Sequence, residues 1–159
     1  MMDISKKIAI DCDDAALEMK KAIILYLESK GFIIVDLKYS ENKSAYYPEI
    51  GYNLAQKIRS GEFDRGILLC GTGLGMAMIA NKVEGVYAGV CHDVFSAERL
   101  AKSNNAQIMT MGARVIGPEL AKMIVYAWLC SDFEGGSSTQ KVQQMRDLEK
   151  VSFHGGSEA

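Results

Sequence analysis

Short apolar runs alternate with longer segments of helical period along most of the chain. The runs are compact, and several are rich in β-branched residues, as expected for strands buried on both faces of a parallel sheet. We predict five strands, at residues 7–10, 32–37, 66–70, 86–90 and 107–111. This alternation predicts a doubly wound, three-layer Rossmann-like α/β domain with a sheet of five parallel strands.

Helices are predicted between the strands and after the last one, at residues 15–30, 48–60, 74–82, 94–103, 118–130 and 139–151. Gly31 suits the left-handed end of the first helix. Pro48 suits the first turn of the second, where its missing N–H costs little. Residues 1–151 are therefore expected to form one domain, followed by a loose polar tail at 152–159.

Composition narrows the classes of function. The chain has 159 residues, enough for one hydrophobic core and too few for two ordinary domains. With 48% hydrophobic residues, 24% charged residues and a net charge of -2, it fits neither a disordered chain nor a general binder of nucleic acid or membrane surfaces. There is no apolar run of membrane-spanning length and no segment typical of a signal peptide after Met1. We expect a cytoplasmic protein.

The cysteines and histidines give no metal-binding pattern. The four cysteines are far apart with no C-x-x-C pair, and the chain has two histidines, His92 and His154. A structural zinc site is therefore not expected, and the cysteines are expected to be free thiols.

Three chemically informative segments follow predicted strands. They are Asp-Cys-Asp-Asp at 11–14, Cys-Gly-Thr-Gly-Leu-Gly at 70–75 and Cys-His-Asp at 91–93. Ligands of such sheets bind outside the carboxyl ends of the strands, where the strand order reverses. We therefore expect these segments to meet at one site.

The segment at 70–75 carries the strongest signal. Its glycines allow backbone N–H groups to face a ligand next to the start of a helix, which favours an anion or a developing oxyanion. The spacing is neither that of a Walker loop nor that of the dinucleotide fingerprint. Cys70 lies at the mouth of this loop, where thiolate is favoured and can act as a base or nucleophile. The alternative, a buried small apolar residue, is the one we expect for Cys12, Cys91 and Cys130.

Several motifs in order resemble the ribose-5-phosphate isomerase B and galactose-6-phosphate isomerase family. They are residues 67–76 and 80–86, Tyr47-Pro48, Cys91-His92-Asp93 with Ser96-Ala97, Gly-Ala-Arg-Val-Ile-Gly at 112–117 and Phe-Glu-Gly-Gly at 133–136. The resemblance extends over nearly the whole chain.

The resemblance implies a sugar-phosphate aldose–ketose isomerase that needs no metal or organic cofactor. The cysteine that matches Cys70 removes the proton next to the carbonyl and so forms a cis-enediolate. Preorganised backbone amides would hold the enediolate oxygen; these belong to Gly71, Thr72, Gly73, Leu74 and Gly75. The hydroxyl of Thr72 would relay a proton between the two oxygens.

The chain departs from the family pattern mainly at the expected phosphate ligands. Asp13-Asp14 stands where the family usually has Asp-His, and the carboxylate of Asp14 would repel phosphate. Ser137 and Lys141 replace two arginines, so that Lys141 keeps a charge without the bidentate fork. Arg114 is retained.

A further departure concerns opening of the sugar ring. The histidine that opens the ring in ribose-phosphate isomerases matches Ser103, which is followed by Asn104, and serine is a poor acid–base group at neutral pH. Either His92 takes over this role or the substrate is open-chain, as a tetrose phosphate would be. Asp13 and Tyr47 are candidate contacts to the sugar, while packing against the next helix is the alternative for Tyr47.

In this family the sites form between subunits. The resemblance therefore implies a homodimer or homotetramer whose last helix reaches a partner subunit and brings Ser137 and Lys141 to its site. Alternatives are a sugar-phosphate-binding subunit without catalytic activity, a sensor, or one member of a pair of unlike chains. Because Cys70 is present, an active subunit is favoured. The carbon number of the substrate and its need for phosphate stay undecided.

Overall fold

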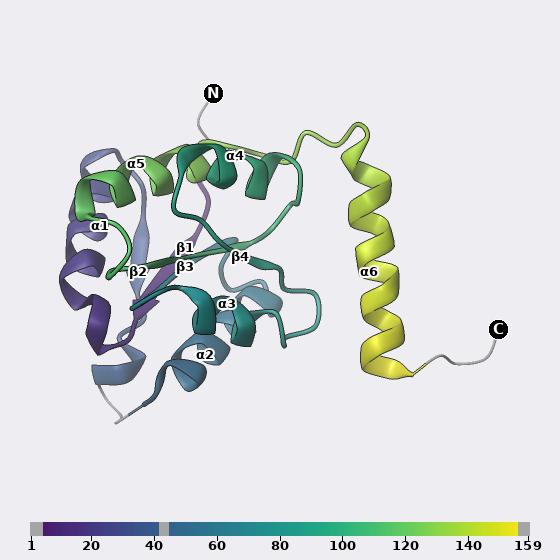
Figure 1. Ribbon diagram of the computed structural model, residues 1–159, viewed down its shortest axis with the longest axis horizontal. Coiled ribbons are helices and arrows are strands. Elements are labelled where there is room, and N and C mark those ends of the chain that lie inside the picture. The colour runs from purple at the N-terminus through teal and green to yellow at the C-terminus, as the bar shows by residue number, and fades with distance from the viewer. Residues whose placement is uncertain (1–4, 42–44, 156–159) are drawn as a thin grey trace.

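A computed structural model describes residues 5–41 and 45–155. Its centre is a sheet of five parallel strands in the order β2-β1-β3-β5-β4 (Figure 1). The strands are β1 (Ile8–Cys12), β2 (Ile34–Asp36), β3 (Arg65–Cys70), β4 (Ala88–Val90) and β5 (Ile108–Gly112). The predicted doubly wound α/β fold is confirmed.

Helices cover both faces of the sheet and make three layers (Figure 1). On one face lie α1 (Leu17–Ser29), α4 (Val94–Lys102) and α5 (Pro118–Leu129), and on the other lie α2 (Tyr47–Arg59) and α3 (Leu74–Ala80). Alternate strand residues supply the two cores. Ile67 and Leu69 face the first layer, whereas Leu68 and Cys70 face the second.

Strand order defines a switch point at the carboxyl ends of β1 and β3. The chain passes from β1 to β2 on one side and returns to β3 on the other. The crevice between the ends of β1 and β3 therefore lies where ligands of this sheet type bind. Asp13 follows β1 and its N–H donates to Leu69 O at 3.2 Å, which ties it to the end of β3 beside Cys70.

The boundaries differ from the prediction where side chains cap the elements. The predicted first helix begins instead with a short 3₁₀ turn, η1 (Asp14–Ala16), because Asp13 accepts the N–H of Ala15. The third helix ends at Ala80 rather than 82, and the amide of Asn81 bonds to Ala77 O and Ala88 O. The fourth strand begins at Ala88 rather than 86.

The last helix, α6 (Ser138–His154), stands beside the domain rather than in either layer (Figure 1). It extends to His154 and so includes the start of the predicted tail, whose residues 156–159 lie outside the described part of the chain. Only Val142 of α6 is buried. Within residues 5–41 and 45–155, no helix has the length and apolar character needed to span a membrane.

Candidate active site

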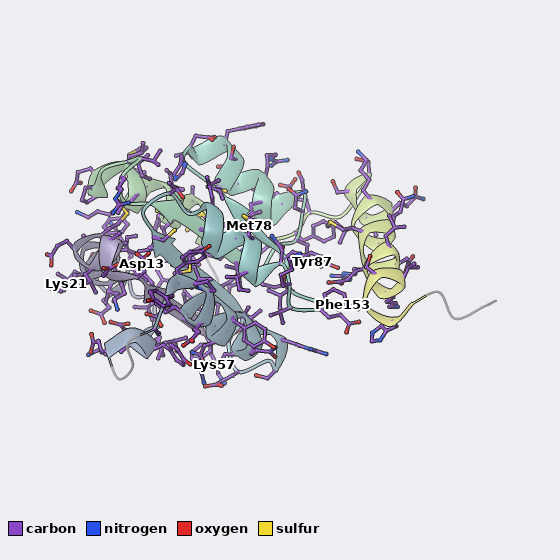
Figure 2. The ribbon with its side chains drawn as sticks, turned by 60° about the horizontal axis from the view of Figure 1, so that its bottom comes forward. Asp13, Lys21, Lys57, Met78, Tyr87 and Phe153 are labelled. Carbon is purple, nitrogen blue, oxygen red and sulfur yellow. The ribbon has the colours of Figure 1, made fainter. Side chains whose placement is uncertain are left out.

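A pocket of about 250 Å³ lies at the carboxyl ends of β1 and β3. It is lined by Asp13, Tyr47, Cys70, Gly71, Thr72, Gly75 and Arg114, all of them residues predicted for the site. Figure 2 shows Asp13 beside η1 and the start of α1. The structure thus brings together, in one chain, side chains from four separate segments of the sequence.

Cys70 is the last residue of β3, and its side chain is 5% exposed. Its Sγ accepts the N–H of Gly73 at 3.0 Å. A backbone donor at that distance stabilises negative charge on sulfur. The thiol is thus buried among apolar neighbours on one side and borders the pocket on the other.

The other cysteines lack this arrangement. Burial raises the pKa of Cys12 and of Cys91 to about 12, so both are neutral, buried thiols as predicted. Cys130 is exposed at the end of α5, so the expectation that it is buried is wrong. Helix α5 ends at Leu129, so Cys130 follows the helix and its side chain lies outside the core.

Close contacts fix the path of the loop at 70–75. Gly73 has φ +79°, and a Cβ there would lie 2.9 Å from the backbone of Met111. Its carbonyl accepts the hydroxyl of Thr110 at 2.8 Å. A Cβ on Gly75 would lie 2.5 Å from the ring of Tyr47, so that ring rests directly on the loop backbone. The loop therefore needs glycine at position 73, whereas a side chain at position 75 would have to displace the ring of Tyr47.

Two of the five amides predicted to hold an oxyanion are engaged inside the loop. The N–H of Gly73 donates to Cys70, and that of Leu74 donates to the hydroxyl oxygen of Thr72 at 3.3 Å. Leu74 directs its side chain to solvent, being 57% exposed. Helix α3 has only seven residues, and the donor that contacts the thiol is the Gly73 amide.

Arg114 is held over the loop by its own backbone. Its N–H donates to Gly71 O at 3.0 Å, and Ala113 N–H donates to Cys70 O at 2.8 Å. A Cβ on Gly71 would lie 3.1 Å from Nη1 of Arg114, so the guanidinium covers that glycine. Burial raises the pKa of Asp13, while the Ala15 amide and the charge of Arg114 oppose this rise. The pocket thus presents a cation and a carboxylate near the thiol.

Asp14 and His92 are not among the residues that line this pocket. Asp14 is exposed and lines a different hollow, with Leu17, Glu18 and Pro118. It lies one residue after Asp13 on a 3₁₀ turn, which rotates its side chain away. His92 is half-buried, and its Nε2 accepts the N–H of Gly112 at 2.9 Å.

The remaining predicted residues lie away from Cys70 within one chain. Ser103 follows α4, which runs back to the amino edge of the sheet, and its hydroxyl accepts from Arg99 at 3.3 Å. Asn104 is exposed next to it. Ser137 precedes α6, and Lys141 borders a hollow formed by α6 side chains alone. Their assignment to a site stays a prediction.

Asp11 belongs to the segment at 11–14 that was expected at the site, but its burial and its partners were not predicted. Asp11 is 0% exposed and accepts the N–H groups of Cys12 at 2.9 Å and Tyr39 at 3.2 Å. Lys20 of α1 lies 3.9 Å from it and donates to Asp36 at 2.9 Å. Lys20 lies four residues after the buried Ala16 and three before the buried Ile23, so the helical period places this lysine on the inner face.

No group of three or more histidine, cysteine or acidic side chains is arranged to hold a metal ion in the described part of the chain. The residues that line the pocket offer a thiol, a carboxylate, a hydroxyl, a guanidinium and backbone amides. A thiol base beside preorganised donors suits proton transfer next to a carbonyl.

A parallel α/β sheet with a thiol at its switch point suits an isomerase. The model of the family described as Ribose/Galactose Isomerase matches residues 8–145, and the chain belongs to this family.

Individual relatives cover almost all of the chain. A D-erythrulose-4-phosphate isomerase of Pectobacterium atrosepticum is 50% identical over 148 residues, which are 92% of this chain and 97% of that protein. A ribose-5-phosphate isomerase B of Listeria innocua is 47% identical, over 91% of this chain and 97% of that protein. The solved structure of Clostridium thermocellum ribose-5-phosphate isomerase B superposes with a TM-score of 0.86 at 38% identity, covering 92% and 99% of the two chains.

Proposed function

We propose that this isomerase interconverts the aldose and ketose forms of a four-carbon sugar phosphate, erythrose 4-phosphate and erythrulose 4-phosphate. The observation that carries the proposal is the Cys70 thiol, held 3.0 Å from the Gly73 amide in a pocket shared with Arg114. The name of the relative from Pectobacterium atrosepticum supports the carbon number.

In the proposed reaction the Cys70 thiolate takes the proton from C2 of the aldose. The electrons of that C–H bond form the C1–C2 double bond of a cis-enediolate, and the carbonyl electrons move to oxygen. The thiol then returns the proton to C1, while the hydroxyl of Thr72 passes a proton between the two oxygens. The amides of Gly71, Thr72 and Gly75, which border the pocket, would hold the negative oxygen.

Substrate recognition is shared between two copies of the chain in this proposal. Arg114 would bind the phosphate and Asp13 the sugar hydroxyls from the copy that carries Cys70. Ser103, Asn104, Ser137 and Lys141 would come from a partner in a homodimer or homotetramer, since they lie away from the pocket of their own chain. The free, buried thiols of Cys12 and Cys91 suit a reducing cytoplasm.

The proposed preference for a four-carbon substrate follows from the acid–base groups that opening of a sugar ring would need. A furanose phosphate must be opened before its C2 proton becomes acidic, which needs a proton donor and acceptor near the ring oxygen. Ser103 is a poor group for that step, and Nε2 of His92 already accepts the Gly112 amide. A tetrose 4-phosphate cannot close a furanose ring, because the hydroxyl required is esterified. Such a substrate needs no ring-opening group.

Turnover of erythrose 4-phosphate and ribose 5-phosphate by the purified chain tests the proposal. We expect kcat/KM for the tetrose phosphate to exceed that for the pentose phosphate by about a hundredfold, equivalent to roughly 2.7 kcal/mol. Equal values would contradict the inference that ring opening limits the use of the pentose phosphate.

Cys70→Ser should abolish turnover while substrate still raises the Tm, and turnover by this variant would exclude Cys70 as the base. Binding without turnover by the wild-type protein would favour a sensor.

A further inference from the structure

His92 makes one specific contact that the proposed reaction does not use. Its Nε2 accepts the N–H of Gly112 at 2.9 Å. The pairing of β4 with β5 ends at Val90 and Thr110, after which Cys91 N–H donates to Thr110 O at 2.9 Å. Gly112 lies beyond that last pair, so the imidazole of His92 takes the place of a strand carbonyl as the acceptor for its amide.

Gly112 supports the loop that carries the thiol. It is in register with Cys70, and a Cβ on it would lie 2.5 Å from Thr72 Cα and 2.6 Å from Gly71 O. The next two residues donate their N–H groups to Cys70 O and Gly71 O. A shift of Gly112 would therefore move the loop backbone and, with it, the start of the segment that carries Arg114.

The direction of the hydrogen bond restricts the state of the imidazole. An amide N–H can only donate, so Nε2 must offer a lone pair and the ring proton must be on Nδ1. An imidazolium has no lone pair and could not make this contact. In this state Nε2 is also not free to exchange protons with a sugar ring. The neighbouring carboxylate of Asp93 is engaged as a helix cap by the N–H of Ser96 at 2.7 Å.

We propose that His92 is a positioning residue of the isomerase, whose neutral imidazole holds the segment from Gly112 to Arg114 against the Cys70 loop. The inference rests on the proposed isomerase activity. It also assigns His92 a role other than ring opening. The second histidine, His154, contacts Glu84 near the end of α6, so neither imidazole faces the pocket in one chain.

A matched pair of variants distinguishes positioning from proton transfer. His92→Gln keeps an acceptor at the place of Nε2 but cannot transfer protons at neutral pH, whereas His92→Phe keeps the ring shape without an acceptor. We expect kcat/KM for erythrose 4-phosphate to stay within about threefold of wild type in His92→Gln and to fall at least about tenfold in His92→Phe. Loss of activity in both variants to the same extent, or in neither, would overturn the proposal.

Measurements without substrate keep the inference separate from the proposed function. In the wild-type protein, ¹⁵N chemical shifts of His92 should report a proton on Nδ1, and a proton on Nε2 would contradict the contact. In a Cys130→Ser background, the rate of Cys70 alkylation should be unchanged by His92→Gln and altered by His92→Phe. If erythrose 4-phosphate is not turned over at all, the proposed function fails while these two measurements still decide the role of His92.

Discussion

At the scale of single residues, the contact between Gly75 and Tyr47 shows how one missing side chain shapes the pocket. Gly75 lies in the first turn of α3, where alanine would normally be the better helix former by about 1 kcal/mol. A Cβ would, however, meet the ring of Tyr47 at 2.5 Å. Since Tyr47 is 43% exposed, its ring can swing outward, so the ring is displaced more readily than the helix.

We therefore expect Gly75→Ala to raise KM for the sugar phosphate about tenfold with little change in Tm. The gain in helix propensity and the strain at Tyr47 act in opposite directions on stability, whereas displacement of the Tyr47 ring leaves the pocket without its aromatic wall. Steady-state kinetics and thermal unfolding measure the two effects. Gly117→Ala is the control, because a Cβ at Gly117 has nothing within 4 Å. An unchanged KM would show that Tyr47 does not contact the substrate.

The residues expected at the site differ in how far the sequence could predict their positions. Cys70, Gly71, Thr72 and Gly75 were predictable because they are consecutive or nearly so and follow a buried strand. Asp14 was not, because the direction of its side chain depends on the 3₁₀ turn that Asp13 begins. For His92, the imidazole suggested acid–base chemistry in ring opening. In the structure its Nε2 accepts a hydrogen bond from an amide 20 residues away, which the sequence alone does not indicate.

At the scale of elements, a buried ionic cluster joins β1, α1 and β2. Asp11 of β1 is 0% exposed, Lys20 of α1 is 2% exposed, and Asp36 ends β2. Burial raises the pKa of Asp11, and the Cys12 and Tyr39 amides and the charge of Lys20 oppose it. For Lys20, burial would lower the pKa, but the hydrogen bond to Asp36 and the nearby charges raise it overall. The cluster positions the end of β1, immediately before Asp13.

We expect Lys20→Met to lower the free energy of unfolding by about 3 kcal/mol at pH 7.5, because it leaves the buried Asp11 charge without its cation. Removing Lys20 raises the pKa of Asp11 further above its ordinary value of 3.8. Between that value and the raised one, the folded protein holds a proton that the unfolded chain has released, so stability increases as the pH falls. The deficit relative to wild type should therefore shrink toward pH 5.

Urea unfolding of Lys20→Met and wild type at pH 7.5 and pH 5 measures this pH dependence. Lys21→Met is the matched control, since Lys21 is exposed and pairs with the exposed Glu18 in a surface salt bridge. It should change stability by less than about 1 kcal/mol at either pH. A deficit for Lys20→Met that grows toward pH 5 would contradict the burial of an ionised Asp11.

The elements themselves were largely predictable, whereas their ends were not. Apolar runs identified all the strands of the sheet because a parallel sheet is buried on both faces. The ends depend on particular side chains such as Asn81, whose amide closes α3 by bonding to the backbone of β4. The burial of Lys20 was not predicted, because a charged side chain is rarely buried without a partner and its partners, Asp11 and Asp36, come from two other elements.

At the scale of the whole molecule, α6 has one anchored side and one free side. Glu149 accepts the N–H of Gly85 at 2.9 Å and the hydroxyl of Tyr87 at 2.7 Å, and Tyr87 lies where the domain meets α6 (Figure 2). Yet Leu148 and Val151 of the same helix are 61% and 57% exposed. An anchored helix with exposed apolar side chains suits a second copy of the chain, which would bring Lys141 to a neighbouring site.

Mixing two inactive variants tests whether the site is shared between copies. Cys70→Ser lacks the base and Lys141→Ala lacks the cation, so we expect each alone to be strongly impaired. In a two-fold symmetric dimer assembled at random from equal amounts, half of the molecules are hybrids and each has one intact site, so about a quarter of wild-type activity should return. The measurement is turnover after the two variants are unfolded together and refolded. Each variant refolded alone is the control. If activity does not exceed the sum of these controls, Lys141 acts on the Cys70 of its own chain or not at all, and the shared site is excluded.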